Sequence, residues 1–301
     1  MLSKAGGCYR VHVGGITLET AVRGRLKRAG AGRILVGDVV SLESAEGRTP
    51  TVEEVLPRRS VLRRRTPGQQ RGVRDVAANV DQVIVIGSAR SPDWDPHLMD
   101  RFTAVAAANH LPLVVVVNKS DLLDDPGVLG EPYVRAGYPV VIASVPQRRG
   151  LDELEEILTG EISLFTGPTG VGKSSLLNAL QPALRLRTGA VSAKSRGGRH
   201  TTVSAEMYPL SQGGFVVDTP GLRDVGLWGL DPLDVAEAFP EFAAYAGHCR
   251  FDNCRHVREP QCAVENAATR GDIPGTRLES YRRLLDEALR ADRPWLSENQ
   301  K

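Results

Sequence analysis

The stretch Gly167-Pro168-Thr169-Gly170-Val171-Gly172-Lys173-Ser174-Ser175 matches the pattern G-x-x-x-x-G-K-[ST] at every fixed position. Glycines allow the backbone to curl so that successive N–H groups point at phosphate oxygens. In such a loop Lys173 would reach the β- and γ-phosphates of a nucleotide, and the hydroxyl of Ser174 would ligate Mg²⁺. The stretch therefore predicts a phosphate-binding loop, or P-loop.

The flanks of this loop support the interpretation. Ile162-Ser163-Leu164-Phe165-Thr166 predicts a short buried strand, and residues 174–180 predict the start of a helix. A P-loop needs this order of strand, loop and helix, because the helix N-terminus adds its dipole to the anion site. A chance glycine-rich turn would need neither flank, so we prefer the P-loop.

From residue 80 the sequence alternates between strand-like and helical segments. Strands are predicted at 83–86, 113–117, 140–143, 162–166 and 215–217, with helices at 96–109, at 151–158 and from 174. This alternation predicts an α/β fold with a doubly wound, mostly parallel sheet, in which ligand-binding loops follow the carboxyl ends of the strands. We assign this fold to residues 76–230.

A second motif, Asn118-Lys119-Ser120-Asp121, directly follows a predicted buried strand. The carboxylate of Asp121 would accept two hydrogen bonds from guanine, one from N1–H and one from the exocyclic amine, in an arrangement that adenine does not offer. Because unpaired buried polar groups are costly, this one carboxylate can select the base. Ser144 and Val145 lie where a second loop that contacts guanine is expected.

A third motif, Asp218-Thr219-Pro220-Gly221, ends another predicted strand. Its carboxylate would hold Mg²⁺ through water, and the N–H of Gly221 would meet the γ-phosphate. Between the P-loop and this motif lies Arg196-Gly197-Gly198-Arg199-His200-Thr201-Thr202. Thr201 or Thr202 is the expected second Mg²⁺ ligand of a switch loop, and the sequence does not decide between them; both are also compatible with the entry to a strand.

The position after this third motif is Leu222, where many GTPases have the glutamine that orients the attacking water. Unassisted hydrolysis is therefore expected to be slow. His200, beside the threonine pair, is the nearby candidate for positioning water, although a solvated histidine of a switch loop is equally compatible with the sequence.

The order of these motifs is unusual. In a conventional GTPase the P-loop, the switch threonine and D-x-x-G precede N-K-x-D, whereas here Asn118–Asp121 comes first and the chain is circularly permuted. The same pocket can form, because permutation is tolerated where the termini meet at the surface. One consequence is that the loop at Gly221, which would sense the γ-phosphate, leads directly into residues 231–301.

Residues 231–301 are predicted to be mostly helical around a group of metal-ligating side chains. Cys249, Cys254, His256 and Cys262 lie within 14 residues of one another. Three thiols and one imidazole match a closed tetrahedral Zn²⁺ site with a structural role, because no coordination position stays open. His248 is an alternative ligand, less favoured because it adjoins Cys249.

The N-terminal third of the chain differs in both pattern and charge. Short alternating runs separated by glycines predict about five strands in residues 1–56, an OB-like β-barrel that either binds oligonucleotides or only packs against its neighbour. Residues 57–75 predict an arginine-rich linker, in which prolines and glycines argue against a regular element. Residues 1–75 carry a net charge of +8 and residues 76–301 a net charge of −6, which suggests a polyanionic partner or simply a solvated charged surface.

The composition of the 301-residue chain, with 41% hydrophobic and 25% charged residues, is ordinary for a globular protein. Residues 1–8 contain no apolar core of signal-peptide length, and the longest apolar run, residues 111–117, is too short to span a bilayer. We therefore expect a cytoplasmic protein without a membrane partner. We also expect a monomer that does not have DNA as a partner.

Taken together, these features resemble the circularly permuted GTPases of the RsgA family, the small ribosomal subunit biogenesis GTPases. The resemblance covers nearly the whole chain and rests on the three nucleotide motifs, on Arg199-His200-Thr201-Thr202 and on the Cys/His group, with Glu259-Pro260-x-Cys262-Ala263-Val264 similar as well. It implies GTP and GDP as ligands, Mg²⁺, one Zn²⁺ per chain, an OB domain and a zinc domain. The implied partner is the small ribosomal subunit with its rRNA, late in assembly.

A different functional class stays open on the sequence alone. The chain could be a regulatory GTPase that acts on a protein partner, with the barrel and the zinc module as protein-interaction domains. Retention on small subunits with a non-hydrolysable GTP analogue, and loss with GDP, would separate the two classes.

Overall fold

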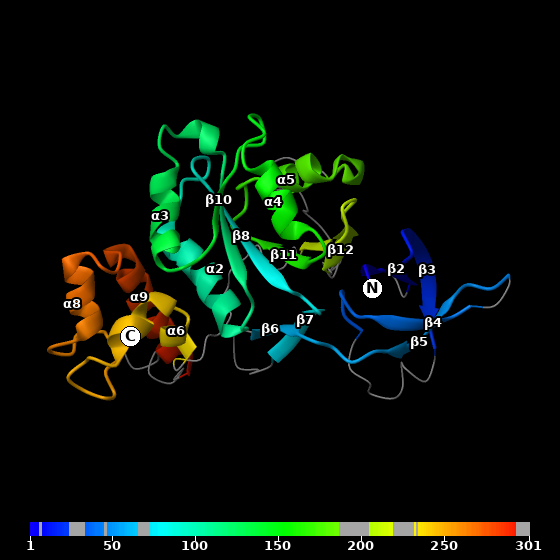
Figure 1. Ribbon diagram of the computed structural model, residues 1–301. Coiled ribbons are helices and arrows are strands. Elements are labelled where there is room, and N and C mark those ends of the chain that lie inside the picture. The colour runs from blue at the N-terminus through cyan, green and yellow to red at the C-terminus, as the bar shows by residue number, and fades with distance from the viewer. Residues whose placement is uncertain are drawn as a thin grey trace, which may run out of the picture.

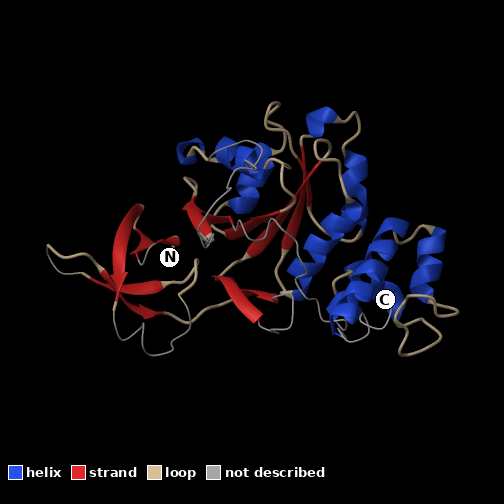
Figure 2. Cartoon of the chain, turned by 180° about the vertical axis from the view of Figure 1, so that it is seen from behind, coloured by secondary structure: helices blue, strands red, loops and turns tan. Residues whose placement is uncertain are grey.

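The computed structural model of the chain describes residues 1–5, 8–23, 34–44, 47–65, 73–186, 205–218, 232 and 234–292. Three groups of elements lie in a row (Figure 1): N-terminal strands at one end, a central α/β unit, and C-terminal helices at the other end. The view from behind shows the same order reversed (Figure 2).

The central sheet has six strands in the order β10-β9-β8-β11-β13-β12. Their bounds are β8 (Gln82–Ser88), β9 (Leu113–Asn118), β10 (Val140–Ile142), β11 (Ile162–Thr166), β12 (Glu206–Pro209) and β13 (Phe215–Asp218). Neighbours are parallel except for β12, which runs antiparallel to β13. The mostly parallel α/β sheet and its five predicted strands are confirmed, while β12 at the edge was not predicted.

Apolar side chains on both faces of this sheet explain its double layer of helices. Along β8, Val83 and Val85 belong to one buried cluster, and Ile84 and Ile86 to the other. The first face is covered by α2 (Pro96–Ala108) and α3 (Gly127–Arg135), the second by α4 (Leu151–Leu158) and α5 (Lys173–Leu180). Burial on both faces is expected of parallel strands, whose side chains alternate between the two sides.

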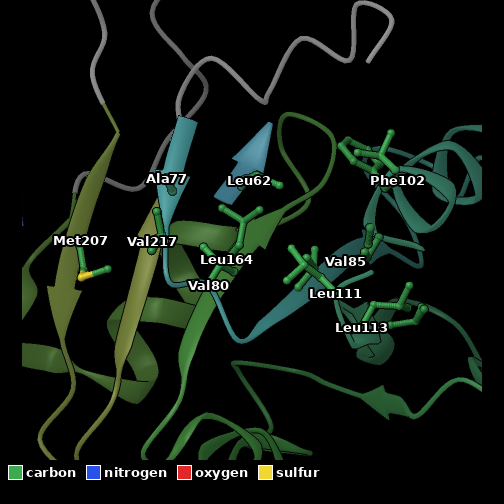
Figure 3. Close-up of a cluster of buried hydrophobic side chains, with 14 of the residues drawn as sticks. Leu62, Ala77, Val80, Val85, Phe102, Leu111, Leu113, Leu164, Met207 and Val217 are labelled. Carbon is green, nitrogen blue, oxygen red and sulfur yellow. The ribbon is translucent and has the colours of Figure 1, made fainter. Parts of the chain in front are cut away.

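Two further strands, β6 (Val61–Arg65) and β7 (Val73–Ala78), form an antiparallel pair next to the sheet. The prediction that residues 57–75 contain no regular element is therefore wrong. The physical reason is burial, because Leu62 and Ala77 pack into the cluster that contains Leu164 and Val217 (Figure 3). Contact with a large apolar core outweighs the weak local preference of an arginine-rich segment.

The N-terminal sheet has five strands in the order β1-β2-β3-β5-β4. They are β1 (Ser3–Ala5), β2 (Cys8–Val13), β3 (Ile16–Val22), β4 (Val40–Glu43) and β5 (Thr51–Val55). The alternating runs that begin at Ile16 and at Ala21 both enter a single strand, β3. Tyr9, Val11 and Val52 pack in the small core of this sheet.

A buried seam joins this sheet to the central unit. The carboxylate of Asp38 accepts hydrogen bonds from the guanidinium of Arg58 at 2.6 and 2.9 Å. Gly37 has φ of +91°, and a Cβ there would lie 1.9 Å from the carbonyl oxygen of Ala78. Only glycine tolerates both the left-handed backbone and this close approach.

The C-terminal part comprises α6 (Asp234–Glu237), α7 (Ala243–Ala246), α8 (Ala263–Arg270) and α9 (Gly275–Asp292). A 3₁₀ turn at Pro240–Phe242 lies between α6 and α7, and two other 3₁₀ turns, Ser120–Leu122 and Pro182–Leu184, belong to the central unit. Phe239, Phe242 and Tyr281 form an aromatic core, and α9 packs along α2 of the central unit. None of the helices in the described ranges is both long and apolar enough to cross a bilayer.

Candidate functional site

The predicted P-loop connects β11 to α5, as the sequence indicated. Gly167 has φ of +141°, and a Cβ on it would lie 2.0 Å from the carbonyl oxygen of Ile86, so the loop requires glycine there. Lys173 begins α5, and its Nζ donates to the carbonyl oxygens of Gly167 (2.6 Å) and Pro168 (2.7 Å). The ammonium group is thus held over the curled loop. Ser174 and Ser175 follow it in the first turn of α5.

The N-K-x-D segment lies against this loop although it is about fifty residues away in sequence. Asn118 Nδ2 donates to the carbonyl oxygen of Val171 at 2.8 Å, and Lys119 Nζ donates to that of Gly170 at 2.7 Å. A Cβ at Gly172 (φ +98°) would lie 2.4 Å from Asn118 Nδ2, so glycine is required at this contact. The two predicted motifs therefore form one site at the carboxyl ends of β9 and β11.

Asp121 is joined to the second predicted loop. The hydroxyl of Ser144 donates to Asp121 Oδ1 at 2.5 Å, and the backbone of Ser144 exchanges hydrogen bonds with Arg149 at 3.1 and 3.0 Å. The backbone N–H of Ser120 donates to Ala143 at 3.0 Å. Val145 packs against the buried cluster under α4 and α5. These contacts hold the half-buried carboxylate of Asp121 at the edge of the site.

Asp218 ends β13 and pairs in register with Phe165 of β11, two residues before the P-loop begins. Its carboxylate therefore belongs to the same edge of the sheet. The other residues predicted around the γ-phosphate, namely His200, Thr201, Thr202 and Gly221, lie outside the described residues.

A third segment, which no sequence motif indicated, borders the site. Residues 88–95, here called the 88–95 loop, connect β8 to α2. The N–H of Ala89 donates to the carbonyl oxygen of Asn118 at 2.8 Å, and Lys119 Nζ donates to that of Ser91. The one feature of the sequence that could have indicated this loop is its position after a predicted strand. That strand, β8, lies between β9 and β11 in the sheet, so the loop that follows it reaches the same edge.

The Cys/His group in the C-terminal part converges as predicted. One ligand atom each from Cys249, Cys254, His256 and Cys262 lies within 4.8 Å of all the others. His256 Nδ1 is 3.4 Å from the sulfur of Cys262 and 3.6 Å from that of Cys249. The imidazole therefore presents Nδ1 to the sulfurs, and the four groups could hold one metal ion.

Burial favours the uncharged forms of the side chains in this group. Burial raises the pKa of the Cys254 thiol to about 12 and also raises the pKa of Cys262, because a buried thiolate is disfavoured. Burial likewise lowers the pKa of His256 and keeps the imidazole neutral. A divalent cation between the sulfurs would reverse the preference of the thiols, and neutral imidazole is the form that ligates metals.

The backbone around the group is held by its neighbours. The carboxylate of Glu259 accepts from the N–H groups of Arg255 (2.9 Å) and Val257 (2.8 Å). Partial burial works to raise the pKa of Glu259, but these backbone hydrogen bonds together outweigh it and lower the pKa. The hydroxyl of Tyr281 on α9 donates to the carbonyl oxygen of Arg255 at 2.6 Å. The ligand loop is therefore ordered by contacts from outside the ligand set.

Comparison with known proteins places these features in one family. The RsgA GTPase family matches residues 55–228. The chain belongs to the RsgA GTPase family. It is accordingly a GTP hydrolase, and its motifs follow the circularly permuted order.

The relatives cover almost all of the chain. A small ribosomal subunit biogenesis GTPase RsgA from Gemmatimonas aurantiaca is 44% identical over 94% of this chain and 95% of its own length. One of the same name from Moorella thermoacetica is 39% identical over 97% of this chain and 98% of its own length.

Two solved structures are similar in fold along nearly the whole chain. The crystal structure of YjeQ from Thermotoga maritima is 33% identical, with a TM-score of 0.77 and 96% of each chain covered. YloQ, described as a circularly permuted GTPase, is 26% identical, with a TM-score of 0.73 over 95% of this chain and 93% of its own.

Proposed function

We propose that this RsgA family member binds the small ribosomal subunit, acts late in its assembly, and hydrolyses GTP to GDP and phosphate faster when bound there. The main support is the match to relatives named small ribosomal subunit biogenesis GTPase RsgA, which covers more than nine tenths of this chain and of each relative. The positive charge of residues 1–75 is consistent with rRNA as the partner, since phosphates dominate such interfaces. In this proposal the N-terminal sheet is an OB-like barrel and the protein a cytoplasmic monomer.

The nucleotide site would work as follows. The backbone of Gly167–Ser175 cradles the phosphates of GTP or GDP, and Lys173 contributes charge beside them. Ser174 and Asp218 hold Mg²⁺, directly and through water respectively. Asp121, oriented by the hydroxyl of Ser144, pairs with the guanine base. His200 with Thr201 or Thr202 would complete the site around the γ-phosphate.

Base choice provides a direct test of Asp121. The Asp121→Asn variant is expected to bind GDP at least about a hundredfold more weakly and to gain affinity for xanthosine diphosphate, because an amide can donate to the xanthine carbonyl. Equilibrium titration with both nucleotides measures the exchange. Asp124→Asn, at an exposed acid of the same segment, is the matched control and should bind as wild type. Unaltered guanine preference in Asp121→Asn would show that another group selects the base.

The metal in the C-terminal part is proposed to be one structural Zn²⁺ per chain, held by Cys249, Cys254, His256 and Cys262. Purified protein should contain about one equivalent of zinc, and Cys254→Ser should lose it. Hydrogen exchange should then increase in residues 240–275 while nucleotide affinity stays near wild type, because the nucleotide loops lie on another unit. Cys8→Ser, at an exposed cysteine outside the group, is the control. A zinc-free wild type with fully reactive thiols would contradict the assignment.

The subunit partner is tested by sedimentation of the full chain with purified ribosomal subunits. The proposal predicts co-sedimentation with small subunits in a non-hydrolysable GTP analogue, release in GDP, and weaker binding as salt is raised. Binding to neither subunit in either nucleotide would favour the alternative, a GTPase that acts on a protein partner.

A further inference from the structure

The 88–95 loop touches both nucleotide motifs and belongs to neither. Its Ser91 carbonyl accepts from Lys119 Nζ, and a Cβ built on Gly170 of the P-loop would lie 3.4 Å from Pro92 Cδ. Three loops, those at 88–95, 118–121 and 167–172, therefore meet around one lysine side chain.

The ammonium group of Lys119 is shared between two of these loops. It donates to the carbonyl oxygen of Gly170 at 2.7 Å and to that of Ser91. An ammonium has three N–H donors, so one is left to reach a ligand. The side-chain Cε lies 3.9 Å from the position of a Cβ on Gly172, so the lysine stem runs along the P-loop. Holding the ammonium at two points restricts a side chain that otherwise has much rotamer freedom.

A buried hydroxyl holds the carbonyl of Pro92, the residue that follows Ser91. Ser88, at the end of β8, is 2% exposed, and its Oγ donates to the carbonyl oxygen of Pro92 at 2.6 Å. Beyond this point the loop is anchored by Trp94, whose ring packs edge-on against that of Tyr133. This hydrogen bond spans Ser91 and therefore restrains the peptide unit between Ser91 and Pro92, which carries the Ser91 carbonyl.

We propose that Ser88 is a positioning residue for guanine-nucleotide binding, which acts by fixing the Ser91 carbonyl against the Lys119 ammonium. Without this hydroxyl the Pro92 carbonyl loses its donor and the Ser91 carbonyl is free to turn away. Lys119 then keeps one anchor instead of two, and its stem and third N–H donor are less well oriented toward the nucleotide. The inference rests on the proposed role of residues 118–121 in nucleotide binding.

The test compares Ser88→Ala, Lys119→Met and the double variant of the full chain, by equilibrium and dissociation-rate measurements with a fluorescent GDP analogue. Ser88→Ala should weaken binding roughly five- to tenfold, the effect of one lost hydrogen bond. The double variant should bind no more weakly than Lys119→Met, because Ser88 acts through the lysine. Ser88→Thr, which keeps the hydroxyl, should retain most of the affinity.

Ser163→Ala is the matched control, since Ser163 is a fully buried serine of the same sheet whose hydroxyl accepts from Gln82 at 3.0 Å. It should leave GDP affinity unchanged. Wild-type affinity in Ser88→Ala together with a loss in Lys119→Met would overturn this inference and leave the nucleotide site intact. Losses that add in the double variant would overturn it as well. Wild-type affinity in Lys119→Met would overturn both the inference and the assignment of the motif.

Discussion

Replacing Lys173 with alanine is expected to lower single-turnover GTP hydrolysis by roughly a hundredfold or more, which is the usual effect of removing a preorganised group that stabilises developing charge. Lys173 begins α5, and its ammonium lies over the loop at the carbonyls of Gly167 and Pro168. The positive end of the helix dipole would add to its charge at this point. The neighbouring ammonium group, that of Lys119, is held instead at the carbonyl oxygen of Gly170.

Lys4→Ala is the matched control for this result. Lys4 lies in β1 of the N-terminal sheet, where its ammonium stands 5.2 Å from the centre of the Tyr9 ring. Hydrolysis by this variant should equal that of wild type, and unfolding curves of both variants should show that the fold is retained. A Lys173→Ala protein that turns over GTP at the wild-type rate would reject the P-loop assignment.

Replacing Arg277 with leucine is expected to destabilise the C-terminal part by about 3–5 kcal/mol. The side chain of Arg277 on α9 is 1% exposed and is paired with Asp100 of α2 at 2.7 Å and with Glu241 at 2.7 Å. Its guanidinium also lies 4.5 Å from the ring centre of Phe239. Removal of the arginine would leave two carboxylates buried without their counter-charge, which is the costly way to break a buried ion pair.

Chemical unfolding, followed by a probe in the C-terminal helices, measures this loss. Arg290→Leu on the same helix is the control, because Arg290 is 78% exposed and pairs with Asp286 one turn away. Such an exposed pair contributes about 0.5 kcal/mol or less. Similar unfolding midpoints for the two variants would show that the Arg277 network does not hold α9 to α2.

The core of the fold and most of the site were predictable because their signals are local. Apolar runs such as residues 113–117 predict buried parallel strands, and the P-loop and N-K-x-D motifs each lie at the end of one. Parallel strands bring their carboxyl ends to one edge, so the meeting of Asn118 with Val171 follows from topology. The convergence of Cys249, Cys254, His256 and Cys262 was likewise indicated by their close spacing.

The features that the sequence did not predict depend on distant partners. Strands β6 and β7 form because Leu62 and Ala77 meet the central core, which no local pattern shows. Arg277 is buried because two carboxylates from separate segments meet it, whereas arginine alone is expected at the surface. The 88–95 loop contacts residues 118 and 119 through its own backbone groups, and these carry no side-chain signature.

In the proposed function, the small ribosomal subunit accelerates GTP hydrolysis by this protein. The most direct measurement is the single-turnover rate of GTP hydrolysis by the full chain, alone, with small subunits and with large subunits. We expect slow hydrolysis by the free protein, since Leu222 cannot orient water, and a much higher rate only with small subunits. The same rate in all three conditions would contradict the proposed function.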